Sequence, residues 1–282
     1  MSNTQKKDGL LGKVLLISIS IMFVISSTSL LHSNEAEFII DRFEGITSFS
    51  FSLFDTILYV AYLIAGPFVG FLSARTGRRR IFVIIGAAGT AFATICMTLV
   101  HNYSLLLVFR FFEGAFCVAS WQTLMTMILD LSDSTNRGRN MGIFGTFMAI
   151  SMGLGPMFGG FLAKISLFTP YYVSSAQCVL AFIITVLFIR EPLVAKASQK
   201  PGIAESLAFA RTKPAVIVPA MFNLVDRLHM SFIIFMVPLM LKQLLKLGPE
   251  YRGMLLGVNG LSYIILQYPI GRLSDRVGRF KL

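Results

Sequence analysis

Charged residues are scarce in this sequence. They make up only 14% of its 282 residues, whereas hydrophobic residues make up 55%. A soluble domain is usually about 25% charged, so this chain has too few polar side chains to cover a folded surface in water. The composition therefore excludes an ordinary soluble globular protein. It indicates a lipid bilayer as the solvent, in which a spanning helix needs about 20 apolar residues.

Cysteine is rare, and the motifs of common enzymes are missing. The three cysteines, Cys96, Cys117 and Cys178, form no C-x-x-C pair and no metal-ligand spacing, and we expect them to be small apolar packing residues. The chain has no phosphate-binding G-x4-G-K-[ST] sequence, no H-E-x-x-H sequence and no nucleophile with a matching base. We therefore predict no metal, no cofactor, no catalytic residues and no ATP-driven mechanism in this chain.

Long apolar runs are abundant. Eight of them are long enough to cross a bilayer, and because a backbone in lipid must satisfy its own hydrogen bonds, each is predicted to be a helix. They cover residues 10–31, 50–72, 81–100, 105–129, 142–165, 171–189, 215–241 and 253–270. The first follows Lys6 and Lys7 as a signal peptide would, but it exceeds the usual length of about 7–15 residues. We interpret it as an uncleaved helix of an all-α, multi-pass membrane protein.

Positive charge is distributed unevenly between the loops. The net charge of +11 would, by itself, suggest a nucleic-acid partner. If the amino terminus is cytoplasmic, however, 18 Lys and Arg residues fall on the cytoplasmic side, 5 fall outside and 2 lie within spans. This asymmetry is the positive-inside pattern of membrane proteins. It predicts a cytoplasmic amino terminus and a lipid bilayer as partner, and it accounts for the net charge without nucleic acid.

One polar phrase occurs twice. GFLSARTGRRR begins at Gly70, and GRLSDRVGRFK begins at Gly271, 201 residues later, with six identical positions out of eleven. Each copy follows an even-numbered span, so six spans separate equivalent places and both copies lie on the same side of the membrane. This pattern predicts two parallel repeats, an arrangement known from transporters with a substrate site between the repeats.

Both phrases resemble the signature loop G-x-L-x-D-R-x-G-R-[KR] of the major facilitator superfamily. The matching residues are Gly70, Arg75, Gly77 and Arg78 in the first copy, and Gly271, Asp275, Arg276, Gly278 and Arg279 in the second. The glycines would permit a tight reversal with positive φ and close helix approach, and the arginines would hold the loop at the anionic cytoplasmic face. Ala74 replaces the aspartate that in the family takes part in a cytoplasmic charge relay, which puts that relay in question for the first loop.

Two further elements carry the same resemblance. Residues 110–114 resemble R-x-x-[QE]-G of the fourth helix, and residues 142–160 resemble the element G-x8-G-x3-G-P-x2-G-G associated with antiporters. The matching residues of the second element are Gly142, Gly155, Pro156, Gly159 and Gly160, with Ser151 in place of one glycine. Small residues let membrane helices approach closely, so we expect this fifth helix to pack tightly against a partner in the other repeat and to limit leakage. Ordinary small-residue packing is the alternative interpretation.

The resemblance implies a function. Members of this type move a small solute by alternating access of two helical bundles, and the antiporter-like element favours proton-coupled efflux. The implied partners are a small-molecule substrate and protons, and the implied location is the plasma membrane. A non-transporting fragment or accessory membrane protein is the main alternative and would show no solute flux. A membrane-embedded enzyme is disfavoured.

Charges inside the spans are the candidate site. An ionised side chain at mid-bilayer costs about 2.5–3.5 kcal/mol, so such residues should face protein or a water-filled cavity. Arg110 and Glu113 are three residues apart and share a helix face; they either line the proton or substrate pathway or form a structural ion pair. Asn223, Asp226 and Arg227 mark a polar face of the seventh span, with a coupling role for Asp226 or a buried polar network as the alternatives.

The predicted domain organisation has three parts. Residues 1–190 form a six-helix bundle, residues 191–214 form a polar cytoplasmic linker with three prolines, and residues 215–282 contribute the first two helices of a second bundle. Eight of the twelve helices expected for the resemblance are present, and the simplest interpretation is a truncated or incomplete gene product. The acidic stretch 32–49 is expected to be a solvated loop, and Asp55 a solvated residue near a helix start.

Overall fold

A computed structural model describes residues 3–133, 136–191, 212 and 217–277. Its helices are α1 (Asn3–Ser29), α2 (Glu35–Ile40), α3 (Ser48–Thr76), α4 (Arg79–Leu99), α5 (Tyr103–Asp130), α6 (Arg137–Ala163), α7 (Thr169–Leu187), α9 (Ile217–Ser231), the π-helical turn η2 (Phe232–Met236), α10 (Val237–Leu245) and α11 (Pro249–Val277). The described part of the chain contains no strand. The all-helical prediction is therefore confirmed.

The long helices match the predicted spans. Seven stretches of the described residues are long and apolar enough to cross a membrane, six of them in α1 and α3–α7 and the seventh over residues 224–245, across the end of α9, η2 and α10. The π-helical turn η2 ends two residues before Pro238, which has no backbone N–H to continue the regular hydrogen-bond pattern. The eighth predicted span, 253–270, lies in α11, which is not among those seven.

The sequence repeat has a structural counterpart. Helix α3 and helix α11 are each 29 residues long. Their first residues, Ser48 and Pro249, lie 201 residues apart, and so do their last residues, Thr76 and Val277. That offset equals the offset of the duplicated phrase. The predicted repeat therefore extends beyond the loop to a long helix that begins at the equivalent residue and continues to the last described residue, Val277.

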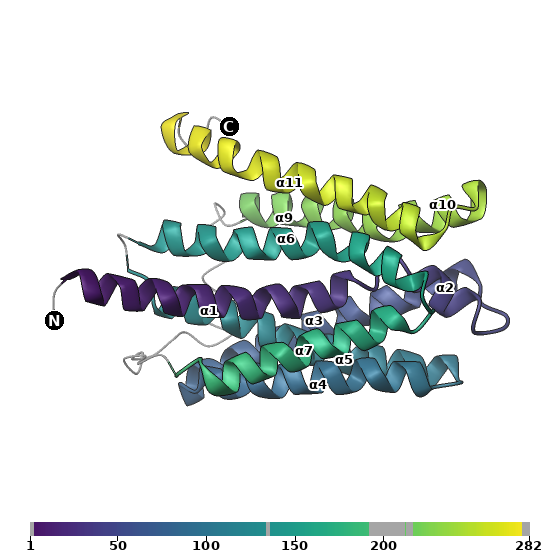
Figure 1. Ribbon diagram of the computed structural model, residues 1–282, viewed down its shortest axis with the longest axis horizontal. Helices are drawn as coiled ribbons and strands as arrows, with labels where there is room; N and C mark the ends of the chain where they lie inside the picture. The colour runs from purple at the N-terminus through teal and green to yellow at the C-terminus, as the bar shows by residue number, and fades with distance from the viewer. Residues whose placement is uncertain (1–2, 134–135, 192–211, 213–216, 278–282) are drawn as a thin grey trace.

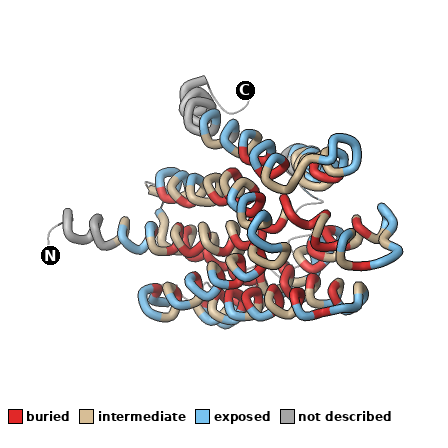
Figure 2. Tube along the Cα trace, turned by 45° about the vertical axis from the view of Figure 1, so that its right-hand side comes forward, coloured by how far each residue is buried: buried red, intermediate tan, exposed pale blue. Residues whose placement is uncertain are grey.

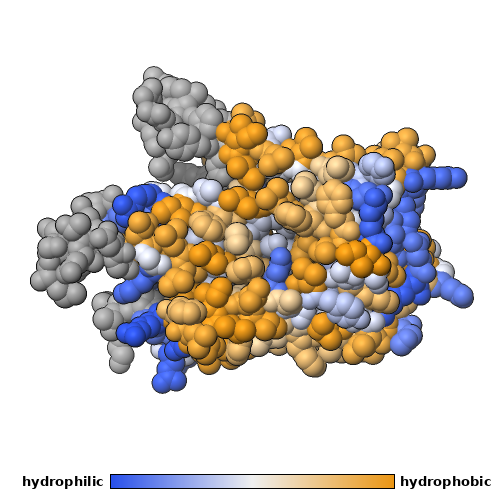
Figure 3. Space-filling model, viewed as in Figure 1, coloured by the Kyte–Doolittle hydropathy of each residue, from blue (hydrophilic) through white to orange (hydrophobic). Residues whose placement is uncertain are grey.

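The helices lie side by side along the long axis of the molecule (Figure 1). The start of α1, the start of α4 and the end of α11 lie at one end, and α2 lies at the other, which we call the α2 end (Figure 1). On the face shown in Figure 3, hydrophobic residues fill the middle of the molecule and hydrophilic residues gather toward its two ends. This distribution is the one expected of a bundle whose middle lies in lipid.

Helix α2 is the main departure from the predicted architecture. The acidic stretch 32–49 was expected to be a solvated loop, and that expectation is wrong for residues 35–40. Phe38 and Ile39 are fully buried in the hydrophobic cluster of the α2 end, and the Phe38 ring stacks on the Tyr171 ring with centroids 3.8 Å apart. Burial of these apolar residues draws the neighbouring acidic residues into the protein. Figure 2 shows the buried residues of this end beside those of the helix bundle.

Candidate functional site

The fully buried Arg110 lies at the centre of a cluster of charged side chains. Its Nη1 donates to Glu113 Oε2 at 2.8 Å, one turn along α5. Its Nη2 lies 3.0 Å from Glu35 Oε1 of α2 and 3.0 Å from Asp55 Oδ1 of α3. Helix α5 is positioned at its start by Asn102, whose side chain accepts hydrogen bonds from the first backbone N–H groups. Three helices thus bring one guanidinium and three carboxylates together.

The cluster carries more negative than positive charge. Besides the three carboxylates, the guanidinium contacts the Phe54 ring, with its carbon 4.0 Å from the ring centroid. Glu113 is fully buried, and its Oε1 has no hydrogen-bond partner among the described residues. Burying an unbalanced charge costs several kcal/mol in a low-dielectric environment. Proton binding to one of the carboxylates would reduce this cost. The cluster is therefore suited to bind protons.

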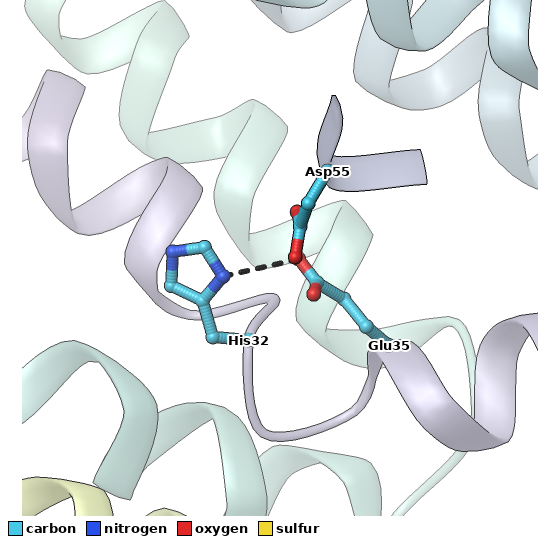
Figure 4. Close-up of side chains that lie close together, drawn as sticks. All are labelled: His32, Glu35 and Asp55. Carbon is cyan, nitrogen blue, oxygen red and sulfur yellow. Dashed lines mark hydrogen bonds and ion pairs between the residues drawn. The ribbon is translucent and has the colours of Figure 1, made fainter. Parts of the chain in front are cut away.

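His32 adds a titratable group at the α2 end of the cluster. Its Nδ1 lies 3.1 Å from Glu35 Oε1 (Figure 4). Burial lowers the pKa of His32, but the Glu35 carboxylate more than offsets this, so the pKa is raised above its usual value. Burial likewise raises the pKa of Glu35, and the opposing effect of His32 and Arg110 leaves it below its usual value. Both directions favour a charged His32–Glu35 pair.

Replacing His32 by glutamine is expected to flatten the dependence of stability on pH. A raised histidine pKa means that the pair stabilises the fold fully below about pH 6.5, the unfolded value, and that this contribution is lost as pH rises through the folded value. The glutamine variant should therefore lose less thermal stability than the parent between pH 6.5 and about pH 8.5. Melting temperatures of the purified protein across this range provide the measurement.

The control for this prediction is His101→Gln, because His101 is an exposed histidine. Its melting temperature should follow that of the parent at every pH. The Glu35 contribution does not interfere, since a lowered carboxylate pKa means that it is lost only at acidic pH, below the window tested. A His32→Gln profile parallel to that of the parent would contradict the prediction.

His32, Glu35 and Asp55 also have the donor types of a metal site. One ligand atom from each lies within 4.8 Å of the others, and Figure 4 shows the three side chains converging. However, Arg110 Nη2 already lies 3.0 Å from both carboxylates. The guanidinium thus takes the position that a cation would need, and we interpret the group as part of the charge cluster.

The structure places the predicted pathway residues in two separate regions. Arg110 and Glu113 meet as their spacing predicts. Asn223, Asp226 and Arg227 lie on α9; Asp226 is half-buried, and the side chains of the other two lie outside the described residues. Among the described residues, α9 contributes none of the ion pairs of Arg110, which come from α2, α3 and α5.

Sequence reasoning missed two members of the cluster. Asp55 was expected to be solvated, and this is wrong, because it is only 8% exposed and pairs with Arg110. Glu35 was assigned to a solvated loop and is instead 3% exposed. Nothing in the local spacing links either residue to Arg110, which is 55 and 75 residues away. The one available signal was the cost of an unpaired arginine in an apolar span, which required acidic partners.

The first signature loop is a short turn between α3 and α4. Gly77 ends α3 with φ of 66°, a left-handed conformation that favours glycine. Arg75 and Arg78 are exposed. Of the two roles expected for the glycines, Gly77 serves the reversal and Gly70 serves close helix approach, because Gly70 lies within α3, where a Cβ would be 3.2 Å from Gln122 Nε2.

Neighbouring residues hold this turn in place. Arg79 is buried; its Nε lies 3.0 Å from Asp130 Oδ2 of α5, and its Nη1 donates to Ser73 Oγ at 2.8 Å. The Glu191 carboxylate accepts the backbone N–H groups of Arg79 and Arg80 at the start of α4, where negative charge is favourable. These contacts dock the loop even though it carries Ala74.

The second signature loop is only partly described. Residues 271–277, including Gly271, Asp275 and Arg276, form the last turns of α11, and their side chains lie outside the described residues. Gly278 and Arg279 lie outside them entirely. Residues 271–277, which were predicted to follow the eighth span as a loop, are thus helical, and the rest of the predicted loop lies outside the described residues.

The small residues of α6 lie on two packing stripes. A Cβ added at Gly155 or Gly159 would lie 2.0 or 1.9 Å from atoms of Ser29 or Leu30, at the end of α1 and just after it. Pro156 and Gly160 instead face α11. Gly142, the first residue of the antiporter-like element, is exposed and a Cβ there would meet nothing within 4 Å.

The second stripe of small residues packs against α11, so α11 is the partner in the other repeat that was expected for the fifth span. A Cβ at Gly160 would lie 2.4 Å from Pro249 O, one at Gly253 would lie 2.3 Å from Pro156 O, and one at Gly260 would lie 2.1 Å from Gly153 Cα. The backbones of these two helices therefore contact each other at these glycines, which have no side chain to separate them. The axes of α6 and α11 diverge toward the carboxyl end of α11 (Figure 1).

Comparison with known protein families identifies the architecture. The sequence pattern of the Major Facilitator Superfamily matches residues 14–282, which include the charge cluster, the first loop and the α6–α11 contact. The chain belongs to the Major Facilitator Superfamily. This is a family of membrane transporters and not of enzymes, so the chain is a multi-pass integral membrane protein.

Curated relatives of this major facilitator protein include drug-resistance proteins. It is 26% identical over 187 residues to the quinolone resistance protein NorA of Staphylococcus aureus strain MSSA476, which covers 66% of this chain and 48% of the relative. It is 34% identical over 96 residues to an uncharacterized transporter of Schizosaccharomyces pombe, which covers 34% of this chain and 20% of that protein. The chain thus spans about half the length of the NorA proteins that it matches.

Solved major facilitator structures share the fold. A bacterial homologue of the human lysosomal transporter Spinster superposes with a TM-score of 0.72 at 15% identity, over 99% of this chain and 64% of that one. A D-xylose–proton symporter superposes with a TM-score of 0.60 at 13% identity, over 93% and 68% of the two chains. At these identities the likeness concerns the fold alone.

Proposed function

We propose that this protein exports small organic solutes across the plasma membrane by alternating access, with proton influx as the energy source and a cytoplasmic amino terminus. The division into residues 1–190, 191–214 and 215–282 is part of the proposal, with the two helical groups as the moving bodies. Family membership supports transport in general. The buried charge cluster around Arg110 supports protons as the coupling ion.

The observation that carries the proposal is the excess of buried carboxylates. Glu35, Asp55 and Glu113 face a single guanidinium that keeps its charge at all relevant pH values. Because an unbalanced buried charge is costly, the free energy of the cluster depends on how many protons its carboxylates bind. A group of this kind can favour one conformation when protonated and another when deprotonated, which is what coupling to protons requires.

Glu113 is the proposed proton carrier within the cluster. Its Oε2 accepts from Arg110 while its Oε1 has no hydrogen-bond partner among the described residues. A proton on the free oxygen would therefore leave the Arg110 contact intact. Asp55, at 8% exposure, is the least buried of the three carboxylates and is the proposed entry point for protons.

The proposed substrate class rests on the name of a relative and on the polar residues of α9. The NorA proteins are named for quinolone resistance, which favours amphipathic, drug-like compounds for this chain as well. We propose that Asn223, Asp226 and Arg227 of α9 line the substrate pathway, with Asp226 meeting the positive part of a cationic compound or taking a coupling proton. Asp226→Asn keeps the size of the side chain and tests this assignment by loss of efflux.

Replacing Glu113 by glutamine is expected to uncouple transport from protons. Glutamine keeps the side-chain carbonyl that accepts from Arg110 but cannot release a proton at this site. In proteoliposomes loaded with a fluorescent amphipathic dye, an imposed proton gradient should accelerate dye movement at least about tenfold in the parent and should have no effect in the variant, a loss of about 1.4 kcal/mol or more of coupling free energy.

The matched control is Glu44→Gln, because Glu44 is an exposed carboxylate in the same half of the chain. It should retain gradient-driven dye movement that a protonophore abolishes. If Glu113→Gln remains fully gradient-driven, Glu113 belongs to a structural ion-pair network that holds α5 against α2 and α3. If the parent moves no dye of a broad panel under any gradient, the alternative of a non-transporting membrane protein is favoured.

A further inference from the structure

A second group of charges lies at the α2 end, between α2 and the carboxy-terminal helices. Glu37 of α2 accepts a hydrogen bond from Arg252 Nη2 of α11. Lys242 of α10 lies 2.8 Å from Asp41 Oδ1 and 3.7 Å from Glu37 Oε1, and its Nζ also donates to the Ala36 carbonyl at 3.2 Å. All of these contacts join residues more than 200 positions apart in the sequence.

Arg252 makes this group energetically important. Its side chain is fully buried, and its Nε and Nη1 have no hydrogen-bond partner among the described residues. Glu37 is thus the described group that balances its charge. Removing one partner of a buried ion pair costs about 3–5 kcal/mol, because the remaining charge is left uncompensated. Separation of α11 from α2 would admit water to Arg252 and relieve that cost.

Apolar packing accompanies these ion pairs. Leu239 of α10 is 6% exposed and is part of the hydrophobic cluster of the α2 end, whose other buried members come from residues 31–171. The Phe235 ring of η2 stacks on the Phe51 ring of α3 with centroids 5.1 Å apart. The close α6–α11 contact at Gly160 and Gly253 continues the same interface.

We infer that Glu37, Asp41, Lys242 and Arg252 form an ionic latch that holds the α2 end closed, and that α2 links this latch to the charge cluster around Arg110. The latch itself follows from the contacts described above. The link rests on the proposed function, because it assigns a consequence to proton binding in that cluster. The latch consists of salt bridges from the carboxylates of Glu37 in α2 and Asp41 directly after it to the cations Lys242 of α10 and Arg252 of α11.

The geometry of α2 explains how the two charge groups would communicate. Residues two apart on a helix point to different sides, so Glu35 reaches Arg110 while Glu37 reaches Arg252. The helix has only six residues and is anchored by the buried Phe38 and Ile39. A displacement of Glu35 would therefore move Glu37 with it, since a short, packed helix moves as one piece.

The charged and titratable groups that face Glu35 come from three elements. His32 precedes α2, Asp55 lies on α3 and Arg110 lies on α5. Neutralising Glu35 would remove the charge attraction from its contacts with His32 and Arg110. The two ion pairs of Glu35 would then weaken together. Helix α2 would be held less firmly against α3 and α5, and Glu37 would be positioned less well to pair with Arg252.

The latch is tested by the reactivity of a buried cysteine. In a background with Cys96, Cys117 and Cys178 replaced by alanine, Leu239→Cys places one thiol under the latch. The purified full chain in lipid nanodiscs is treated with a charged maleimide, which reaches the thiol only when the α2 end opens. Adding Glu37→Gln should accelerate labelling about tenfold, which corresponds to about 1.4 kcal/mol in favour of opening.

Two further variants keep the test decisive. Lys242→Gln should also accelerate labelling. It tests the latch without a substitution of the buried Arg252, which could prevent folding. Lys164→Gln breaks an ion pair with Glu250 across the same interface, but the Lys164 side chain is 56% exposed, so labelling should change less than about twofold. Labelling of both Glu37→Gln and Lys242→Gln at the rate of the parent would overturn the latch.

The link through α2 is tested with the latch residues unchanged. Glu35→Gln in the same reporter background should accelerate labelling at least about threefold, or about 0.7 kcal/mol. An unchanged rate would overturn the link and leave the latch in place. Because labelling in nanodiscs needs neither a proton gradient nor a substrate, an altered rate in a protein that transports nothing would contradict the proposed function and support the latch.

Discussion

Replacing Arg110 by glutamine is expected to abolish transport and to destabilise the protein severely. The substitution leaves Glu35, Asp55 and Glu113 buried around a neutral side chain. The loss of the charged partner of a buried ion pair costs about 3–5 kcal/mol, a large part of a typical folding free energy of about 5–15 kcal/mol. The checks are the yield of monodisperse protein in detergent, its melting temperature and gradient-driven dye movement.

The control for this prediction is Arg139→Gln, which removes the same charge from an exposed position at the start of α6. Its melting temperature should remain within the error of the parent. The Arg110 variant should also recover part of its stability at low pH, where its three carboxylates bind protons and the repulsion between them disappears. An Arg110→Gln protein as stable and as active as the parent at neutral pH would show that the cluster contributes to neither property.

Replacing Gly260 by valine is expected to force α6 and α11 apart and to abolish transport. A Cβ at Gly260 would lie 2.1 Å from Gly153 Cα and 3.0 Å from Gly153 N, which are backbone atoms that cannot rotate away. Overpacking of this kind costs about 1–3 kcal/mol, and the whole length of the interface must shift to relieve it. Dye movement, together with thiol labelling of Leu239→Cys, measures both consequences.

The control is Gly142→Ala on α6. Gly142 belongs to the same antiporter-like element, but a Cβ there meets no atom within 4 Å. Alanine is favoured over glycine in a helix by about 1 kcal/mol, so this variant should transport normally and be as stable as the parent or more so. If the two variants behave alike, contact between α6 and α11 is not what the small residues provide.

Three glycines of the antiporter-like element illustrate what sequence analysis can and cannot predict. Gly142, Gly155 and Gly160 belong to one motif, yet they face open space, α1 and α11 respectively. The motif specified a helix with little side-chain volume, because small residues are needed wherever two backbones touch. Which residue faces which neighbour depends on the rotation of α6 within the bundle, and that rotation is set by all of its neighbours together.

The charge cluster likewise contains one contact that the sequence predicted and others that only the structure revealed. The spacing of Arg110 and Glu113 predicted their contact, because residues three apart on a helix share a face. The contacts of Arg110 with Glu35 and Asp55, and of Glu37 with Arg252, join residues 55 to 215 positions apart. Partners at such separations leave no trace in local spacing, so they had to be found in the folded protein.

By itself, the sequence determined the membrane environment, the approximate limits of seven of the eight predicted spans, the repeat offset of 201 residues and the family. These properties follow from the length of apolar runs and from local motifs, which act over short stretches of chain. Only the tertiary structure decided that α2 is a buried helix carrying acidic residues to two separate groups of charges. Its burial depends on apolar contacts of Phe38 and Ile39 with distant helices, and a short acidic segment gives no local sign that such contacts exist.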